Sequence, residues 1–315
     1  MDNNTQQINI SSSTGLVGLF GYPAKHSLSP FIQNIFLMDN NIDTVYLTFE
    51  FPEEKLLSAF NGARNLGVCG LNITMPYKER ICGLAENTDY LSEATGSVNT
   101  IRFDSKKNGI EATGFNTDID GFAVSVKETG CSLENKNCLV IGAGGAARSA
   151  VFAFLGMKAK TVYIYNRTLK KAEKIKQLFC EEERKKIKIV KSLETIVKKK
   201  INFNLICNCT PLGMNTRGMM DSIPVPENLE LKNMIVFETI YDPLETKLIK
   251  KAKNEGAIVI DGLDMLINQA ASSFNIWFGI FPDTKNIKEM VLEHLKNKKK
   301  SCIRKIYNSR KGTSK

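Results

Sequence analysis

Histidine is scarce in this chain, which has 315 residues but only His26 and His294. A zinc site or a Ser–His–Asp triad would need more histidines, or better placed partners, so we expect neither. The eight cysteines have no repeated spacing. Cys207 and Cys209 share one face of an apolar run, which favours a buried strand over a metal site. We therefore predict no bound metal.

Long hydrophobic runs are also missing. Hydrophobic residues make up 43% of the chain, enough for sizeable cores, yet no stretch approaches the roughly 18 apolar residues of a membrane span. Residues 1–14 have neither the basic nor the apolar region of a signal peptide. We expect a disordered leader on a cytoplasmic protein that has no contact with membranes.

Acidic residues are absent from the C-terminal end. Lys296–Lys315 holds nine Lys or Arg and no Asp or Glu, whereas the rest of the chain carries 34 basic and 33 acidic residues. The net charge of +10 therefore belongs to the end of the chain. We predict a solvated, disordered tail over 295–315 and no nucleic-acid partner.

A glycine-rich turn is the most informative feature that is present. An apolar run ends at Ile141, and Gly142-Ala143-Gly144-Gly145-Ala146 then opens a helical pattern. Gly142 allows the tight turn, Gly144 lets the backbone approach a pyrophosphate, and Ala147 lets helix and strand pack closely. The free N–H groups of the helix would face the phosphates. The pattern predicts a nicotinamide or flavin dinucleotide.

The end of the next strand indicates which dinucleotide. Thr161–Tyr165 is followed by Asn166 and Arg167, where an NAD site usually has an acidic residue. A guanidinium pairs with a 2′-phosphate that a carboxylate would repel. We therefore expect NADP; the alternative is that Arg167 merely begins a solvated helix.

Strand-like and helix-like segments alternate along the chain, which predicts α/β architecture with two domains. We expect a substrate-binding domain over 15–115 and a doubly wound, Rossmann-type domain over 116–264. A C-terminal helix within 265–294 is expected to return to the first domain. Predicted strands are 16–21, 44–49, 67–74, 98–102, 138–141, 161–165, 186–190, 204–208, 234–238 and 258–260; predicted helices begin at 29 and span 52–66, 77–84, 146–155, 169–180, 193–199 and 265–278.

Polar residues gather at three other places. Ser27 and Ser29 precede a helix and offer hydroxyls to an anion, although Ser29 could simply be the N-cap. Asn72, Thr74 and Lys78 follow a strand end, where open α/β sheets bind ligands. Lys78 is either a proton donor or a solvated lysine. Asp118 is either an N-cap or a partner for Lys78.

These motifs together resemble the shikimate dehydrogenase family. Nine signatures occur in family order between about residues 15 and 280: HSxSP (26–30), NxTxPxK (72–78), VNT (98–100), NTDxxG (116–121), GAGGAxR (142–148), NRT (166–168), NxTPxGM (208–214), YxPxxT (241–246) and DGxxMLxxQA (261–270).

The resemblance implies NADP-dependent interconversion of 3-dehydroshikimate and shikimate in aromatic amino-acid biosynthesis. It implies that Lys78 and Asp118 are the catalytic pair, and that the substrate is a small molecule. By the same resemblance the substrate-binding residues are Ser27, Ser29, Asn72, Thr74, Asn99, Tyr241 and Gln269. The cofactor-binding residues are Gly142, Ala143, Gly144, Gly145, Ala146, Asn166, Arg167, Thr168, Lys171, Thr239, Gly262 and Met265.

The chain departs from the family pattern in a few places, and rival functions exist. Glu238 stands where many members have Asp, and Thr239 and Asp264 stand where small or apolar residues are commoner. A quinate/shikimate dehydrogenase is the closest rival, although Ser27 and Ser29 resemble those of shikimate-specific members. A non-catalytic ligand sensor is disfavoured because the catalytic pair is present. Another Rossmann reductase would not explain the other motifs. We expect a monomer or a homodimer.

Overall fold

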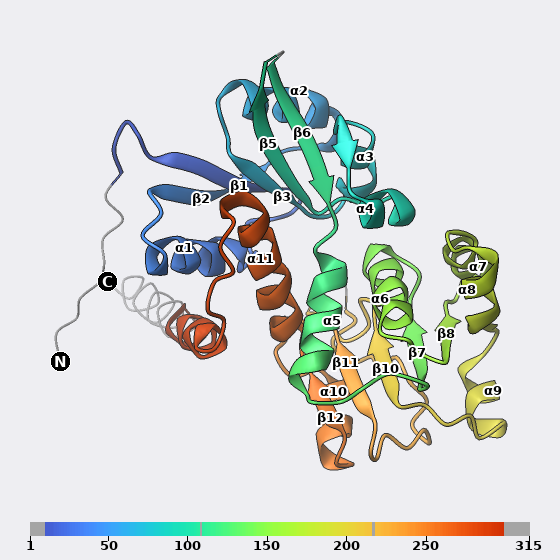
Figure 1. The fold of residues 1–315 in the computed structure, drawn as a ribbon. Coiled ribbons are helices and arrows are strands. Elements are labelled where there is room, and N and C mark those ends of the chain that lie inside the picture. The colour runs from blue at the N-terminus through green and yellow to red at the C-terminus, as the bar shows by residue number, and fades with distance from the viewer. Residues whose placement is uncertain (1–9, 108, 216–217, 299–315) are drawn as a thin grey trace, which may run out of the picture.

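The computed structural model describes residues 10–107, 109–215 and 218–298, and these form two six-stranded sheets (Figure 1). Strands β1 to β6 build the first sheet and strands β7 to β12 the second. Each sheet thus comes from one continuous half of the chain. Within the described ranges, no helix has both the length and the apolar character needed to cross a membrane.

The first sheet is mixed and has the strand order β2-β1-β3-β5-β6-β4. β1 pairs in parallel with β2 and β3, whereas β5 runs antiparallel to β3 and β6. β3 lies between β1 and β5 in the middle of this sheet and is buried along its whole length. The strands are β1 (Gly15–Gly21), β2 (Thr44–Glu50), β3 (Gly70–Ile73), β4 (Asn87–Thr88), β5 (Thr100–Lys106) and β6 (Gly109–Phe115).

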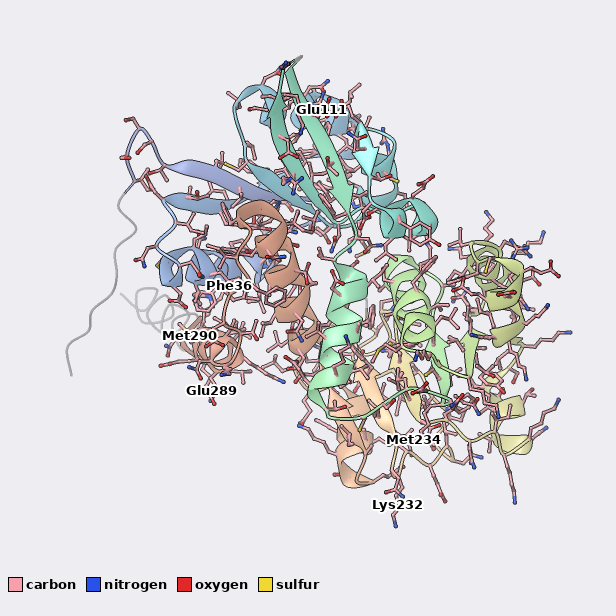
Figure 2. All side chains as sticks on the ribbon, in the orientation of Figure 1. Phe36, Glu111, Lys232, Met234, Glu289 and Met290 are labelled. Atoms are coloured by element: carbon pink, nitrogen blue, oxygen red, sulfur yellow. The ribbon has the colours of Figure 1, made fainter. Side chains whose placement is uncertain are left out.

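Each face of the first sheet has its own core. Val17 and Leu19 face one cluster, which includes Phe36. Phe20 and Leu71 belong to a second cluster under α2. Phe36 lies on α1 (Figure 2). Its ring is edge-on to that of Phe274 in a late helix, with ring centroids 5.7 Å apart. The covering helices are α1 (Ser29–Asp39), the 3-10 helix η1 (Glu53–Lys55), α2 (Leu56–Asn65), α3 (Lys78–Cys82) and α4 (Tyr90–Thr95).

The second sheet is parallel throughout, with the order β12-β11-β10-β7-β8-β9. This is the doubly wound order of dinucleotide-binding domains, with β7 as its first strand. Alternate residues of β7 face opposite cores, and this burial on both sides explains its unbroken apolar run. The strands are β7 (Asn137–Ile141), β8 (Thr161–Tyr165), β9 (Ile187–Val190), β10 (Leu205–Asn208), β11 (Ile235–Glu238) and β12 (Ile258–Ile260).

Helices cover both faces of the second sheet (Figure 1). α5 and α6 lie over one face, and α10 packs on β11 and β12. The two-domain α/β fold class predicted from the sequence is thereby confirmed. The helices are α5 (Asp118–Glu128), α6 (Gly145–Gly156), α7 (Leu169–Gln177), α8 (Glu181–Lys186), α9 (Leu193–Lys198), α10 (Lys247–Asn254) and α11 (Gly262–Phe278).

Helix α11 connects the two halves of the molecule, because it packs against both α1 and α5 (Figure 1). Gly121 of α5 makes the close approach possible, since a Cβ there would lie 3.0 Å from the Cβ of Gln269 and 3.1 Å from the Met265 carbonyl oxygen. A further helix over 287–298 returns to α1, where the ring of His294 stacks on Phe31.

Several predicted boundaries are wrong. Helix α1 begins at Ser29 as predicted, but its N-cap is Leu28, so the alternative that made Ser29 the N-cap is wrong. Helix α11 begins at Gly262 and not at 265, because Asp261 caps it with bonds from the Leu263 and Asp264 amides. The predicted helix over 169–180 ends at 177, and a separate helix follows it. Predictions for residues 1–9 and 299–315 lie outside the described residues, while 295–298, predicted to start the disordered tail, are helical.

Candidate functional site

An ion pair joins the two halves of the chain at the centre of the site. Lys78 Nζ donates to Asp118 Oδ2 over 2.5 Å. Lys78 is the first residue of α3, beside the first sheet, and Asp118 is the first residue of α5. The lysine side chain is 23% exposed and the aspartate side chain 9% exposed, so the lysine is the more accessible of the two.

Asn99 holds the other oxygen of the same carboxylate. Its Nδ2 donates to Asp118 Oδ1 over 2.8 Å and to Thr117 Oγ1 over 2.9 Å. Its Oδ1 accepts from the Thr117 amide over 2.8 Å. Asp118 is therefore an acceptor on both oxygens and does not cap α5; the alternative that made it an N-cap is wrong, because Thr117 has that position.

A second buried amide lies close to the first. Asn72, in β3, donates to Ser273 Oγ over 2.9 Å and to Thr100 Oγ1 over 3.2 Å. Its Oδ1 accepts from the hydroxyl of Tyr46 over 2.9 Å. Ser273 also lies 3.0 Å from Thr117 Oγ1, so a continuous network runs from Tyr46 to Lys78.

Sequence reasoning missed four members of this network: Tyr46, Thr100, Thr117 and Ser273. All four are buried. Burial raises the pKa of Tyr46 well above its ordinary value, so its phenol stays protonated and acts as a donor. Ser273 follows Gln269 by four residues on α11, a spacing that places both on one helix face and could have identified it.

Ser27 and Ser29 adjoin the network through Tyr46. Ser27 Oγ donates to Ser29 Oγ over 3.1 Å and accepts from the Ser29 amide. The Ser29 side chain partly offsets the effect of burial on the pKa of Tyr46, which places it near that phenol. The two hydroxyls thus lie together at the start of α1, next to the amide cluster.

The remaining predicted substrate residues differ in how closely they join this cluster. Gln269 Oε1 lies 3.4 Å from Asn99 Nδ2. Thr74 directly follows β3, and its methyl group packs over Gly21. Tyr241 packs at the edge of the α1–α11 core, where burial raises the pKa of its phenol. The structure therefore joins Gln269 to the cluster by contact, but Thr74 and Tyr241 only by their place in the fold.

The glycine turn has the shape that a phosphate group requires. Gly142 adopts φ +121°, and a Cβ there would lie 2.7 Å from the Cys209 carbonyl oxygen. Gly144 and Gly145 have open space where a side chain would be. The turn begins α6 at the end of β7, where the sheet order reverses, and ligands of open α/β sheets bind at such points.

The predicted 2′-phosphate residues lie beside this turn. The Gly142 amide donates to the Tyr165 carbonyl over 2.8 Å. Asn166, the next residue after Tyr165, therefore lies beside the start of the glycine turn. Asn166 Nδ2 donates to the Thr168 carbonyl over 2.9 Å and shapes the loop. Arg167, Thr168 and Lys171 are exposed at the start of α7, whose first turn contains no acidic residue. The donor set is suited to a dianionic phosphate.

The last three predicted cofactor residues gather at the ends of β11 and β12. A Cβ on Gly262 would lie 2.6 Å from the Thr239 carbonyl oxygen, so only glycine allows this approach. Thr239 Oγ1 donates to the Asn208 carbonyl over 2.8 Å. Met265 lies against Gly121, one turn along α5 from Asp118. These residues therefore connect the second sheet to the Lys78–Asp118 pair.

A buried carboxylate supports the same loops. Glu238 accepts from Asn208 Nδ2 over 2.9 Å, from the Ile240 amide over 3.2 Å and from Thr246 Oγ1 over 3.0 Å. Burial raises the pKa of Glu238 to about 7. The longer side chain, where the family pattern has Asp, is thus accommodated by three donors.

Asp264 also has a structural explanation. It completes a capping box with Asp261, and both carboxylates bind Lys288, at 2.7 and 2.9 Å respectively. The Lys288 ammonium comes from the helix over 287–298, so it ties that helix to the start of α11. In the part of the chain that the structure describes, no cluster of three or more His, Cys, Asp or Glu residues could hold a metal ion.

Three family models match the chain. They are the shikimate dehydrogenase substrate binding domain over residues 19–101, shikimate / quinate 5-dehydrogenase over 124–235, and the shikimate 5'-dehydrogenase C-terminal domain over 262–292. Together they cover parts of both sheets and the whole of α11. The first match contains Lys78, the second the glycine turn and the third Gln269.

Individual relatives agree with these matches. Shikimate dehydrogenase (NADP(+)) of Archaeoglobus fulgidus is 37% identical over 280 residues, which cover 89% of this chain and 98% of the relative. A crystal structure of a shikimate dehydrogenase in complex with NADP+ has a TM-score of 0.81 and 33% identity, covering 91% and 97%. The shikimate 5-dehydrogenase of Thermus thermophilus, in complex with NADP(H) and shikimate, has a TM-score of 0.76 and 29% identity, covering 87% and 97%.

Proposed function

The chain belongs to the shikimate dehydrogenase family, and from that premise we propose how its residues carry out the reversible, NADPH-dependent reduction of 3-dehydroshikimate to shikimate. The observation that carries the proposal is the Lys78–Asp118 pair. It contacts the amide and hydroxyl cluster through Asn99, and α5, which Asp118 begins, packs on α6, which follows the dinucleotide turn.

Lys78 is the proton donor to the carbonyl oxygen of the substrate. Hydride addition to a ketone builds negative charge on that oxygen, and an adjacent ammonium both stabilises this charge and supplies the proton. Lys78 is the more exposed partner of its ion pair, so its ammonium faces an approaching ligand. In the reverse direction, the neutral amine accepts the proton of the hydroxyl group.

Asp118 orients this ammonium and binds a substrate hydroxyl. Asn99 donates to one carboxylate oxygen and Lys78 to the other, so the carboxylate is held in a single orientation. The remaining lone pairs can accept from a hydroxyl group of the ligand. We assign the other ring hydroxyls to Asn72, Thr74, Asn99, Tyr241 and Gln269, and the carboxylate to Ser27 and Ser29.

NADPH, when bound, supplies the hydride. The open space over Gly144 and Gly145 fits its pyrophosphate, and the basic start of α7 fits its 2′-phosphate. Thr239, Gly262 and Met265 would hold the end of the cofactor that reaches the substrate. The donor set thus fits this cofactor at each of its three parts.

These assignments give each domain its own ligand. Residues 15–115, completed by 265–294, form the substrate domain, and residues 116–264 form the NADP domain. The protein acts on small molecules in the cytoplasm, as a monomer or a homodimer.

A lysine variant tests the proposed chemistry. Lys78→Ala should retain NADP binding and lower kcat about 10²- to 10⁴-fold, the usual contribution of a positioned proton donor. Lys158→Ala, an exposed lysine on the second domain, is the control and should be unaffected. Near-normal turnover by Lys78→Ala would remove the lysine from the proton-transfer role.

A further inference from the structure

Arg148 of α6 contacts elements that belong to the other sheet. Its Nη1 donates to the Thr95 carbonyl oxygen over 2.9 Å, and its Nη2 donates to the Glu79 carboxylate. Thr95 is the last residue of α4, and Glu79 is in α3. Both of these helices cover the first sheet, whereas α6 opens from the dinucleotide turn of the second sheet.

The carbonyl contact is the better protected of the two. The Arg148 side chain is 18% exposed and the Glu79 side chain 65% exposed. An ion pair with so exposed a partner is screened by water and contributes little. The Thr95 carbonyl lies at the end of α4, where helix carbonyls lack internal partners and attract cations. We therefore expect the Arg148–Thr95 bond to dominate.

A second set of contacts supports the same junction. Asn116 Nδ2 donates to Thr95 Oγ1 over 3.0 Å and lies 3.4 Å from Ser149 Oγ. Ser149 is the residue after Arg148, and these three polar groups are almost completely buried. The end of α4 is thus joined to α6 twice, once through Arg148 and once through Asn116.

Three residues of this junction lie within three positions of a residue of the proposed site. Glu79 follows Lys78, Asn116 comes two residues before Asp118, and Gly145 comes three residues before Arg148. A displacement of α6 relative to α3 and α4 would change the distance between the dinucleotide turn and the proton donor. Hydride transfer is sensitive to such displacements.

We propose that Arg148 is a positioning residue that fixes α6 against α3 and α4, and thereby holds the NADP turn at the correct distance from Lys78. It acts through the junction and does not contact substrate or cofactor. This inference rests on the function proposed above for the Lys78–Asp118 pair. Glu79→Gln should consequently have little effect, because the Thr95 contact remains.

The test compares Arg148→Met and Arg148→Lys with Arg184→Met, a matched control. Arg184 also donates to a backbone carbonyl, of Gln177, but within the second domain. We expect Arg148→Met to lower kcat about 10- to 100-fold. The dissociation constants of NADP and shikimate, each measured alone, should stay within about twofold. The primary isotope effect with deuterated NADPH should rise in Arg148→Met. The kcat of Arg148→Lys should lie between those of the wild type and Arg148→Met.

Small-angle scattering of the ligand-free protein supplies a readout that does not need activity. Arg148→Met should have a larger radius of gyration than the wild type, and Arg184→Met should not. An unchanged radius and unchanged kcat would overturn the proposal. A weakened NADP affinity with normal kcat at saturation would overturn it as well, in favour of direct cofactor contact. An inactive wild type would refute the proposed function, while the scattering result would still decide the role of Arg148.

Discussion

Buried amide and hydroxyl side chains make up most of the proposed substrate side of the site. Asn72 and Asn99 each use both ends of the amide, so their orientation is fixed before a ligand arrives. Neutral groups of this kind suit a polyol and reject analogues that lack a hydroxyl. At the residue scale, affinity for substrate should therefore depend on side chains that do not touch it.

Tyr46→Phe tests this dependence. The change removes the hydroxyl that holds Asn72 Oδ1, and an unsatisfied buried acceptor costs about 1–3 kcal/mol. The KM for shikimate should rise more than kcat falls, and the KM for NADP should stay unchanged. Tyr163→Phe, on β8, is the control. An unaltered KM for shikimate in steady-state kinetics would show that Asn72 needs no such support.

Arg167→Ala tests the choice of cofactor. Hydrogen bonds to charged groups contribute about 1.5–3 kcal/mol, so the dissociation constant of NADP should rise about 10- to 100-fold. Binding of NAD, which lacks the 2′-phosphate, should change little. Fluorescence titration with both cofactors measures the difference, and the neighbouring Lys170→Ala gives the baseline. Equal losses for NADP and NAD would contradict the 2′-phosphate assignment.

The proximity of single residues could be predicted where they belong to a short sequence motif. Lys78, Asp118, Asn99 and Gln269 come together as expected. The supporting residues were not predicted, because Thr100 looks in sequence like any other small polar residue, and the spacing of Ser273 from Gln269 signals only a shared helix face. Their role depends on partners more than a hundred residues away, such as the 173-residue separation between these two.

At the scale of elements, the loops after β10 and β11 depend on one buried carboxylate. Glu238 joins Asn208, Ile240 and Thr246, and Thr246 is also the N-cap of α10. These loops hold Thr239 and approach Gly262. The protonation state of Glu238 should therefore affect how stably this edge of the sheet is held.

The pH dependence of stability tests this carboxylate. Its pKa rises from 4.5 to about 7 in the folded protein, so its stabilising contribution is complete below about pH 4.5 and is lost as the pH rises through 7. The loss amounts to about 3 kcal/mol. Urea unfolding between pH 4.5 and 8 should show this slope in the wild type and not in Glu238→Gln. Parallel curves for the two proteins would contradict the shifted pKa.

Elements were predictable where the apolar pattern is continuous, as in β7 and β8. The helices α5 and α10 were not predicted. Gly121 interrupts the pattern of α5, and its presence is explained only by the close packing of α11. Helix α10 follows a capping Thr246 and has buried Leu248, Ile249 and Ala252 between lysines, a signal that could have identified it.

At the scale of the whole molecule, two sheets with separate cores are joined by few elements. Helix α11 packs on both halves, and Lys78–Asp118 and Arg148–Thr95 cross between them. The alternation of strand-like and helix-like segments predicted the two-domain plan. It could not predict these crossing contacts, because they depend on the relative position of domains that pack independently.

The most direct measurement is the initial rate of cofactor reduction with shikimate or quinate, each combined with NADP or NAD. The account predicts substantial activity with shikimate and NADP, and much lower activity in the other three combinations. Comparable rates with quinate or NAD would contradict the specificity assigned to Ser27, Ser29 and Arg167. No activity in any combination, from folded protein that binds shikimate, would contradict the assignment of Lys78 and Asp118 as a catalytic pair.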